Sequence, residues 1–153
     1  MKTLSLLSVA LALVFLSQPS SAQSLAKATS VRCTFPLMSS SSLHGDVPKA
    51  EIKPPQPTLV LQFTDVNTDE GTAQLKGVYG AYDIVVRYAQ GYLNFIQSFR
   101  DGPVHVTTIL EQKTKAGKLK AMHSRHEFTL VSLPGFTSSP EQYYGDCEIL
   151  TSQ

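Results

Sequence analysis

The sequence predicts an all-β protein, an antiparallel meander of about eight strands that we expect to close into a small barrel. Apolar and polar residues alternate with period two in one segment after another, as at Leu59, Leu61 and Phe63, which share one face of a strand. Short turn signals separate these segments at regular spacing. Such hairpin connections favour a barrel, because closure removes exposed sheet edges; a two-sheet sandwich is the alternative.

Turn signals set the order of the strands. Residues 67–71, Gln90-Gly91 and Asp101-Gly102 are predicted turns, and the last is a strong hairpin signal that lets Pro103 begin the next strand. We expect strands over residues 30–35, 58–64, 72–77, 82–88, 92–100, 103–113, 119–131 and 143–150.

Residues 36–57 differ in character from the rest of the chain. Four serines run together at 39–42, and prolines stand at 48, 54, 55 and 57 with few apolar residues between them. Proline lacks a backbone donor and fixes φ, so we predict a Ser/Pro-rich loop without regular pairing. A loop of this length inside a compact domain is typical of a lid, a binding loop or a mobile connection.

The N-terminus is typical of a secretory signal. A basic start precedes an apolar run over residues 4–16, and residues 20–22 supply the small residues of a cleavage site. The apolar run is too short to span a bilayer. We therefore expect an exported protein, periplasmic or extracellular, with a signal peptide at 1–22, a disordered segment at 23–29 and a single β domain at 30–153.

The mature chain carries no net charge, because removal of Lys2 from the 13 basic residues leaves a number equal to the 12 acidic ones. A balanced chain has no global field to attract nucleic acid or anionic lipid. A basic cluster consists of Lys113, Lys115, Lys118, Lys120 and Arg125. It is interpreted as a solvated hairpin tip, with a surface for a polyanion as the alternative. We expect no nucleic-acid partner, no membrane span, no cofactor and a monomer.

The two cysteines, Cys33 and Cys147, stand near opposite ends of the mature chain. In an oxidising compartment two cysteines have one intramolecular pairing, so we predict a disulfide that ties the first strand to the last. Closing a loop of this size contributes up to roughly 4–5 kcal/mol in the chain-entropy treatment. A redox pair and half of a metal site are the alternatives.

The densest cluster of reactive side chains is His123-Ser124-Arg125-His126. On a strand His123 and Arg125 face one way, whereas Ser124 and His126 face the other. The two histidines therefore cannot share one metal ion, and the neighbouring serine cannot form a nucleophile–base pair. We predict no catalytic residue and no metal ligand, and we take His123, Arg125 and His126 as candidate binding residues.

Tyr143 and Tyr144 stand beside the predicted disulfide and complete the candidate binding set. Alternation sends one ring inward and the other outward, where it is suited to a partner surface. Tyrosines at 79, 82, 88 and 92 are interpreted as ordinary sheet aromatics, with a tyrosine-lined cavity as the alternative.

The runs AMHSRHEF and QYYGDCEI together resemble a pattern found in small exported proteins of Gram-negative bacteria that have no assigned activity. The most specific part is H-S-R-H with Y-Y-G-x-C, and the resemblance covers about the last two thirds of the chain. A broader likeness is to the periplasmic lysozyme inhibitors, which are small β-barrels with a disulfide near the chain ends. The serine-glycine loop of those inhibitors has no counterpart in residues 98–102. The resemblance implies a periplasmic β fold and no mechanism.

Three classes of function follow. The favoured hypothesis is a non-enzymatic β-barrel that binds a partner protein or a small ligand in the cell envelope, through residues 36–57 and the strand ends around 123–126. Its expected signature is a cavity or an exposed aromatic patch at one end of the barrel. The alternatives are a hydrolase or metal-dependent enzyme centred on His123, Arg125 and His126, and an envelope-structural protein.

Overall fold

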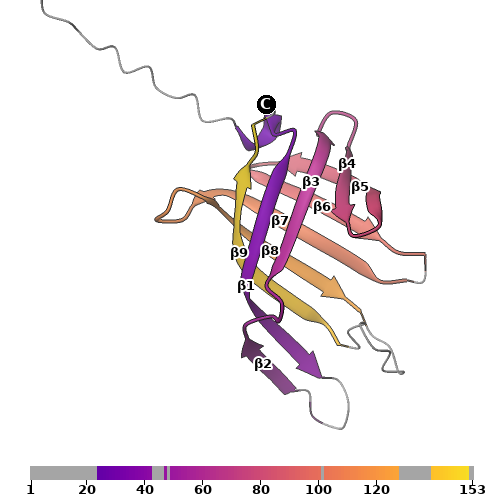
Figure 1. Cartoon of the computed structure of the whole chain (residues 1–153), viewed down its shortest axis with the longest axis vertical. Helices are drawn as coiled ribbons and strands as arrows, with labels where there is room; N and C mark the ends of the chain where they lie inside the picture. Colours follow the sequence, from indigo (N-terminus) through magenta and orange to yellow (C-terminus); the bar gives the residue numbers. More distant parts are fainter. Residues whose placement is uncertain (1–23, 43–46, 48, 101, 128–138, 152–153) are drawn as a thin grey trace, which may run out of the picture.

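The computed structural model describes residues 24–42, 47, 49–100, 102–127 and 139–151. Within these residues the chain forms one short 3₁₀ helix, η1, and nine strands (Figure 1). The bounds are η1 Leu25–Lys27, β1 Val31–Ser42, β2 Lys49–Lys53, β3 Leu59–Asn67, β4 Thr72–Gly77, β5 Gly80–Ala89, β6 Tyr92–Ser98, β7 Val104–Lys113, β8 Leu119–His126 and β9 Glu141–Ile149.

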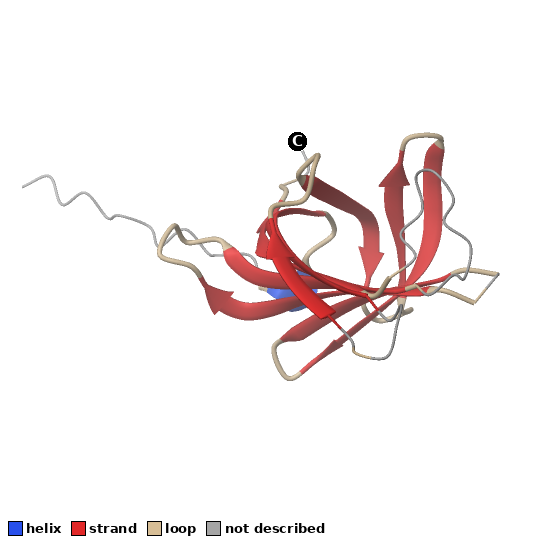
Figure 2. Cartoon of the chain, turned by 90° about the horizontal axis from the view of Figure 1, so that it is seen from below, coloured by secondary structure: helices blue, strands red, loops and turns tan. Residues whose placement is uncertain are grey.

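Eight of the described strands close into a barrel. The order runs from β1 through β3, β4, β5, β6, β7 and β8 to β9, and β9 pairs back onto β1. Each of these pairings is antiparallel. In the view from below the strands curl around a common interior (Figure 2). The predicted all-β barrel is confirmed, and the sandwich alternative is excluded.

The prediction of an unpaired loop over 36–57 is wrong for much of that segment. Strand β1 continues to Ser42. Its second half pairs with β2, a ninth strand that lies beyond Phe35, where the pairing of β1 with β3 stops. Pro36 is tolerated because it lies at a register shift of the β1–β9 pair, between Thr34 and Leu37, where the ladder is already interrupted. The prolines at 54, 55 and 57 lie in the connection between β2 and β3, outside any ladder.

The predicted disorder at 23–29 is also wrong for residues 24–29. The turn of η1 buries Leu25 and Ala28, which are only 1% and 2% exposed, against the end of the barrel core. The hydroxyl of Thr68 donates to the carbonyl of Ala26 at 3.0 Å and helps to hold the turn in place. Two apolar residues within a short polar segment gave too weak a signal to predict this packing. The predicted signal peptide, and the end of the strand predicted over 119–131, lie outside the described residues.

Packed side chains fill the barrel interior. The rings of Phe63 and Phe95 stack with their centroids 3.9 Å apart, and Phe35, Leu93 and Ile109 are likewise buried. A small pocket lined by both stacked phenylalanine rings has a volume of about 10 Å³, which holds at most about one water molecule.

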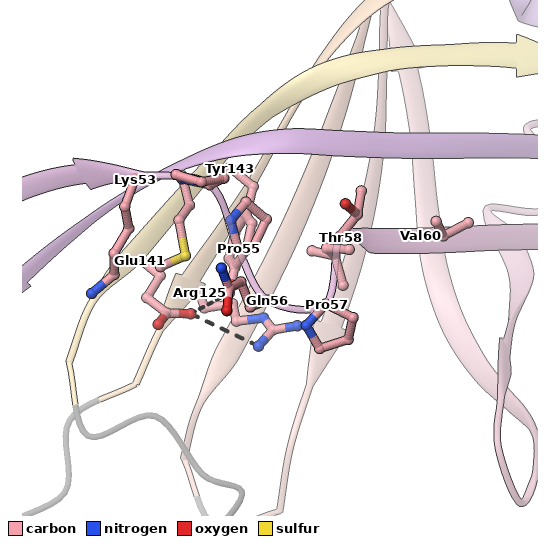
Figure 3. Close-up of a pocket in the computed structure, with 12 residues that line it drawn as sticks. Lys53, Pro55, Gln56, Pro57, Thr58, Val60, Arg125, Glu141 and Tyr143 are labelled. Atoms are coloured by element: carbon pink, nitrogen blue, oxygen red, sulfur yellow. Dashed lines mark hydrogen bonds and ion pairs between the residues drawn. The ribbon is translucent and has the colours of Figure 1, made fainter.

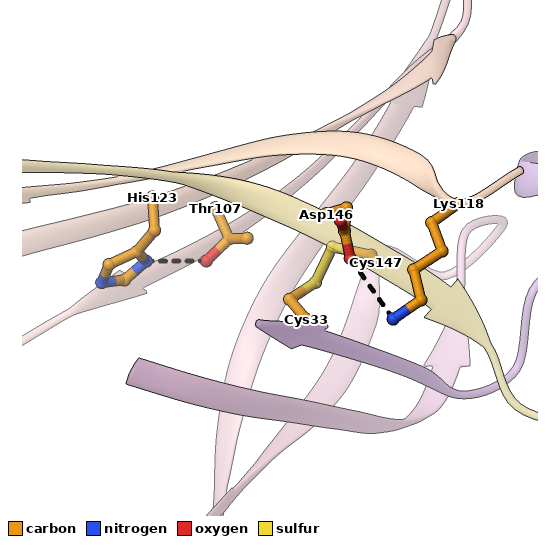
Figure 4. The surroundings of a disulfide bond; sticks show 6 residues. All are labelled: Cys33, Thr107, Lys118, His123, Asp146 and Cys147. Atoms are coloured by element: carbon orange, nitrogen blue, oxygen red, sulfur yellow. Dashed lines mark hydrogen bonds and ion pairs between the residues drawn. A yellow bond between two sulfur atoms is a disulfide. The ribbon is translucent and has the colours of Figure 1, made fainter. Parts of the chain in front are cut away.

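The two cysteines lie where the predicted disulfide requires. Cys33 on β1 is directly opposite Cys147 on β9, the sulfurs are bonded, and both residues are buried (Figure 4). The bond therefore crosses the seam at which the last strand meets the first. Next to it the strands approach so closely that a Cβ on Gly145 would lie 2.0 Å from the carbonyl oxygen of Thr34. Only glycine fits this position.

Candidate functional site

A large pocket opens at the end of the barrel remote from η1, with a volume of about 970 Å³ (Figure 3). The β2–β3 connection forms one wall, and the inward-facing ends of β8 and β9 form the other. The apolar lining comes from Met38, Pro54, Pro55, Pro57, Leu59 and Val60, and the polar lining from Lys53, Gln56, Thr58, Arg125, Glu141 and Tyr143. The pocket thus combines residues from the segment 36–57 with strand ends next to His123.

Strand register explains why the polar side chains of β8 and β9 meet here. Arg125 is paired with Glu141, and His123 with Tyr143, so all four side chains lie on the inward face of neighbouring strands. On the other wall Lys53 is paired with Met38, which points it toward the same space. The same alternation that places apolar side chains in the core therefore places these polar side chains on the inward face at the end of the barrel.

Arg125 is held by three neighbours. Its Nε–H donates to Nε2 of His123 at 3.3 Å, and its guanidinium carbon lies 5.0 Å from the centroid of the Tyr143 ring. Its Nη1 is 3.8 Å from Oε2 of Glu141, which is an ion pair but too long for a hydrogen bond. The guanidinium is therefore fixed in position while its outer edge still faces the pocket (Figure 3).

The hydrogen bonds of His123 settle its tautomer. An arginine Nε–H can only donate, so Nε2 of His123 must accept, and the ring proton resides on Nδ1. That proton is donated to Oγ1 of Thr107 at 2.8 Å (Figure 4). Burial, followed by the positive charge of Arg125 and the proximity of His105, lowers the pKa of His123 to about 3. The imidazole is neutral at physiological pH, and both of its nitrogens are occupied.

Glu141 is held from the other side. The hydroxyl of Tyr143 donates a short hydrogen bond to Oε2 of Glu141, the same oxygen that faces Arg125. Burial, and then this bond to Glu141, raise the pKa of Tyr143 well above its usual value, so the phenol keeps its proton. The carboxylate and the guanidinium are thus each anchored by other side chains, with a gap between them.

A second polar pair lies next to this group. The ring of His105 meets that of His123 edge-on at 5.7 Å, and its Nε2 lies 2.5 Å from Oε1 of Glu127. Burial lowers the pKa of His105 even though Glu127 opposes the shift. Neither residue of this pair was among the predicted binding residues. Strand register is what places His105 here, because it lies directly opposite Arg125 and its side chain therefore faces the same way.

The structure brings together three of the five candidate binding residues and separates the other two. His123, Arg125 and Tyr143 form the inward group described above. His126 and Tyr144 face the outside of the barrel, where both are exposed. His123 and His126 therefore lie on opposite faces of β8 and do not meet in one cleft, as the alternation predicts.

The pocket contains Gln56, which belongs to the segment 36–57 expected to bind, and also Thr58 and Glu141, which were not among the predicted binding residues. Gln56 and Thr58 stand in or beside a proline-rich connection, and no periodic pattern marks the face on which they lie. Glu141 begins β9, two residues ahead of the strand predicted from Tyr143 onward. Its position opposite Arg125 depends on strand register, which a single sequence does not determine.

A second pocket of about 580 Å³ lies beside η1, but its polar side chains are largely occupied. The Asn67 side chain accepts from the backbone N–H groups of Asp69 and Glu70, and the hydroxyl of Thr68 donates to Ala26. This pocket therefore offers fewer groups to a ligand than the one at the other end of the barrel.

In the described part of the chain, no three histidine, cysteine, aspartate or glutamate side chains gather as a metal ion would require. No helix among these residues is long and apolar enough to cross a membrane.

Comparison with models of known protein families, with curated proteins and with solved structures finds no match. The resemblance to small exported proteins therefore stays a prediction.

Proposed function

We propose that this protein is an exported, non-enzymatic binding protein of the cell envelope that takes a small ligand in the pocket at the β2 end of the barrel. The observation that carries the proposal is the state of Arg125, which is held by His123, Tyr143 and Glu141 while it lines a pocket of about 970 Å³. Pockets that bind small molecules commonly combine such a volume with a mostly apolar lining and a few fixed polar groups.

The state of His123 supports a binding role for the pocket rather than a catalytic one. His123 would be a poor general base, because its pKa is about 3 and its Nε2 already accepts from Arg125. The hydroxyl nearest to it belongs to Thr107, which is 2% exposed and does not line the pocket. The groups that do face the pocket are suited to hydrogen bonding and charge pairing. Export is supported by the signal-like N-terminus and by the disulfide.

An NMR screen of the isotope-labelled mature protein against a mixture of small polar compounds tests the proposal. We expect hits to shift the amides of Lys53, Gln56, residues 58–60, Arg125 and residues 141–143, and to leave those beside η1 unchanged. Hits confined to the pocket beside η1, or an absence of hits at millimolar concentration, would contradict it.

A second candidate function is docking to a partner protein through the tip of the β4–β5 hairpin. Val78 and Tyr79 form this two-residue tip and are 93% and 94% exposed. Tight hairpin turns favour Asn-Gly, whereas here two large apolar residues occupy the turn. Tyr82 packs against Gly77 at its base, where an added Cβ would lie 2.4 Å from the Tyr82 ring. The tip thus presents an aromatic group suited to a protein pocket.

Photo-crosslinking from position 79 in cells that export the protein tests this second candidate. We expect one discrete adduct, which disappears when an unlabelled excess of the natural protein competes. A control with the photo-reactive residue at position 148, on the exposed face of β9, should give no such adduct. Identical patterns from the two positions would exclude docking through the tip.

A further inference from the structure

We propose that the ligand of this pocket is a neutral, polyhydroxylated molecule, of which saccharides are the common class. This inference rests on the proposed function and specifies its ligand. It is carried by the arrangement of Arg125 and Glu141 at the inner end of the pocket and by the balance of charge along its rim.

The gap between Arg125 and Glu141 selects for a hydroxyl group. Nη1 of Arg125 and Oε2 of Glu141 are 3.8 Å apart, too far to hydrogen-bond each other and close enough for one small group to contact both. A ligand hydroxyl can accept from the guanidinium and donate to the carboxylate at once. A ligand carboxylate would be attracted by Arg125 but repelled by Glu141, and a ligand ammonium would be attracted by Glu141 but repelled by Arg125, so the pair gives neither charge a net advantage over a hydroxyl.

Both members of the pair are held before a ligand arrives. His123 accepts from Nε of Arg125, and Tyr143 donates to Glu141 while its ring supports the guanidinium. Side chains that are already ordered lose little entropy on binding, which favours an uncharged ligand that offers no strong ionic attraction. The neighbouring His123 is neutral and adds no charge of its own to the pair.

The rim adds no net charge either. Lys53 pairs with Glu51 at 2.9 Å, so its ammonium is compensated locally. Gln56 and Thr58 carry groups that both donate and accept, as hydroxyl-rich ligands require. The apolar wall comes mainly from the rings of Pro54, Pro55 and Pro57, whose fixed φ makes it stiff. Such a surface can pack against the C–H face of a sugar ring.

The test is an NMR titration of the labelled mature protein with a matched series of sugars. Glucose, glucuronate and glucosamine share one ring and differ in charge, and neutral disaccharides of the gluco, galacto, manno and N-acetylglucosamine types extend the series. We expect at least one neutral sugar to shift the side-chain Nε–H signal of Arg125 and the backbone amides of Gln56 and Thr58. Glucuronate and glucosamine should bind at least tenfold more weakly than that sugar.

The substitution Glu141→Gln sharpens the test, since it keeps the shape of the side chain and removes its charge. We expect this substitution to weaken binding of the neutral sugar about tenfold and to strengthen binding of glucuronate, because the charge that repels an acid is gone. Glu148→Gln makes the same change on the exposed face of β9 and should alter neither affinity. Gln56→Ala, in the exposed β2–β3 connection, should weaken binding of the neutral sugar without affecting folding.

The outcomes separate this inference from the proposed function. Tighter binding of the acidic or the basic sugar by the natural protein would overturn the inference and leave a small-ligand pocket. An unchanged order of sugars in Glu141→Gln would also overturn it. If no sugar binds and the screen of small polar compounds finds other ligands in this pocket, only the inference fails. If that screen is also negative, the proposed function fails with it.

Discussion

Arg125 and His123 are joined by a hydrogen bond of 3.3 Å from Nε to Nε2, and its direction fixes the protonation state of the histidine. A protonated imidazole would turn a second donor toward the guanidinium and place two positive charges in contact. His123 is also only 4% exposed. The fold therefore requires a neutral histidine at the centre of the polar group.

This requirement predicts a loss of stability in mild acid. The pKa of His123 is about 3 in the folded protein and near 6.5 in the unfolded chain, so the unfolded state binds the extra proton between these values. The contribution of neutral His123 to the unfolding free energy is therefore fully present above pH 6.5. It decreases as the pH falls toward 3, by at most about 1.4 kcal/mol per pH unit. Urea unfolding at pH 7.5, 6.5, 5.5 and 4.5 measures the slope.

Two histidine variants provide the comparison for that slope. His123→Gln should flatten the dependence of the unfolding free energy on pH between 6.5 and 4.5. The residual slope should include His105, whose pKa burial also lowers. His126→Gln, on the exposed outer face, should keep the natural slope. Equal slopes in the natural protein and in His123→Gln would show that this histidine does not stay neutral.

Coupling between Arg125 and Glu141 is a second prediction. Arg125→Met leaves the Glu141 side chain, which is 9% exposed, without its cation, and should reduce the unfolding free energy by about 1–3 kcal/mol. The double variant with Glu141→Gln should recover part of that loss, because no charge is left unpaired. A double-mutant cycle of unfolding free energies, measured by chemical denaturation, gives the coupling. The control variant Lys118→Met, at the exposed ion pair with Asp146, should lower the unfolding free energy by less than about 1 kcal/mol. Strictly additive effects of the two substitutions would contradict the pairing.

The close approach at Gly145 gives a third prediction. Gly145→Ala would place a Cβ 2.0 Å from the Thr34 carbonyl oxygen, and backbone in the middle of a barrel seam cannot move aside cheaply. We expect a loss of about 2 kcal/mol or more, or a failure to fold. Gly77→Ala is the matched control, because its Cβ would meet the half-exposed Tyr82 ring, which can rotate away. Equal thermal midpoints for the two variants would show that the seam is looser than described.

Removal of the disulfide is the fourth prediction. Cys33→Ala with Cys147→Ala releases a closure that spans 114 residues and should cost about 2–5 kcal/mol in denaturant unfolding. The variant should retain the β-sheet circular dichroism of the natural protein, because the eight barrel strands remain paired. A loss below about 1 kcal/mol would mean that the seam is held by strand pairing alone.

Residue pattern was enough to predict the strands and to favour a barrel over the alternative of a two-sheet sandwich. The alternation at Leu59, Leu61 and Phe63 identifies a strand with one buried face, and the same pattern recurs along the chain, whereas the closure is shown by the pairing of β9 with β1. The alternation also places His123 and Arg125 on one face and His126 on the other. These predictions succeed because a period of two leaves each side chain only two directions.

Other parts of the structure depend on pairing that no local pattern encodes. The sequence predicts a loop over residues 39–42, yet they extend β1 because β2 pairs with all four of them and β9 pairs with Ser39 and Ser40. The pocket arises from two segments that meet only in three dimensions, the β2–β3 connection and the strand ends at Arg125 and Glu141. Register between β8 and β9 decides which side chains face each other there, and a shift of one residue would have turned Glu141 outward.

Native mass spectrometry tests the central claim, a small ligand in this pocket, most directly. The natural protein and the variant with Arg125→Met and Glu141→Gln would be purified gently from cells that export them. We predict an added mass on the natural protein, lost on denaturation, reduced or absent in the variant and equal to that of a neutral sugar. A bare mass for both proteins, or the same added mass on both, would contradict the account.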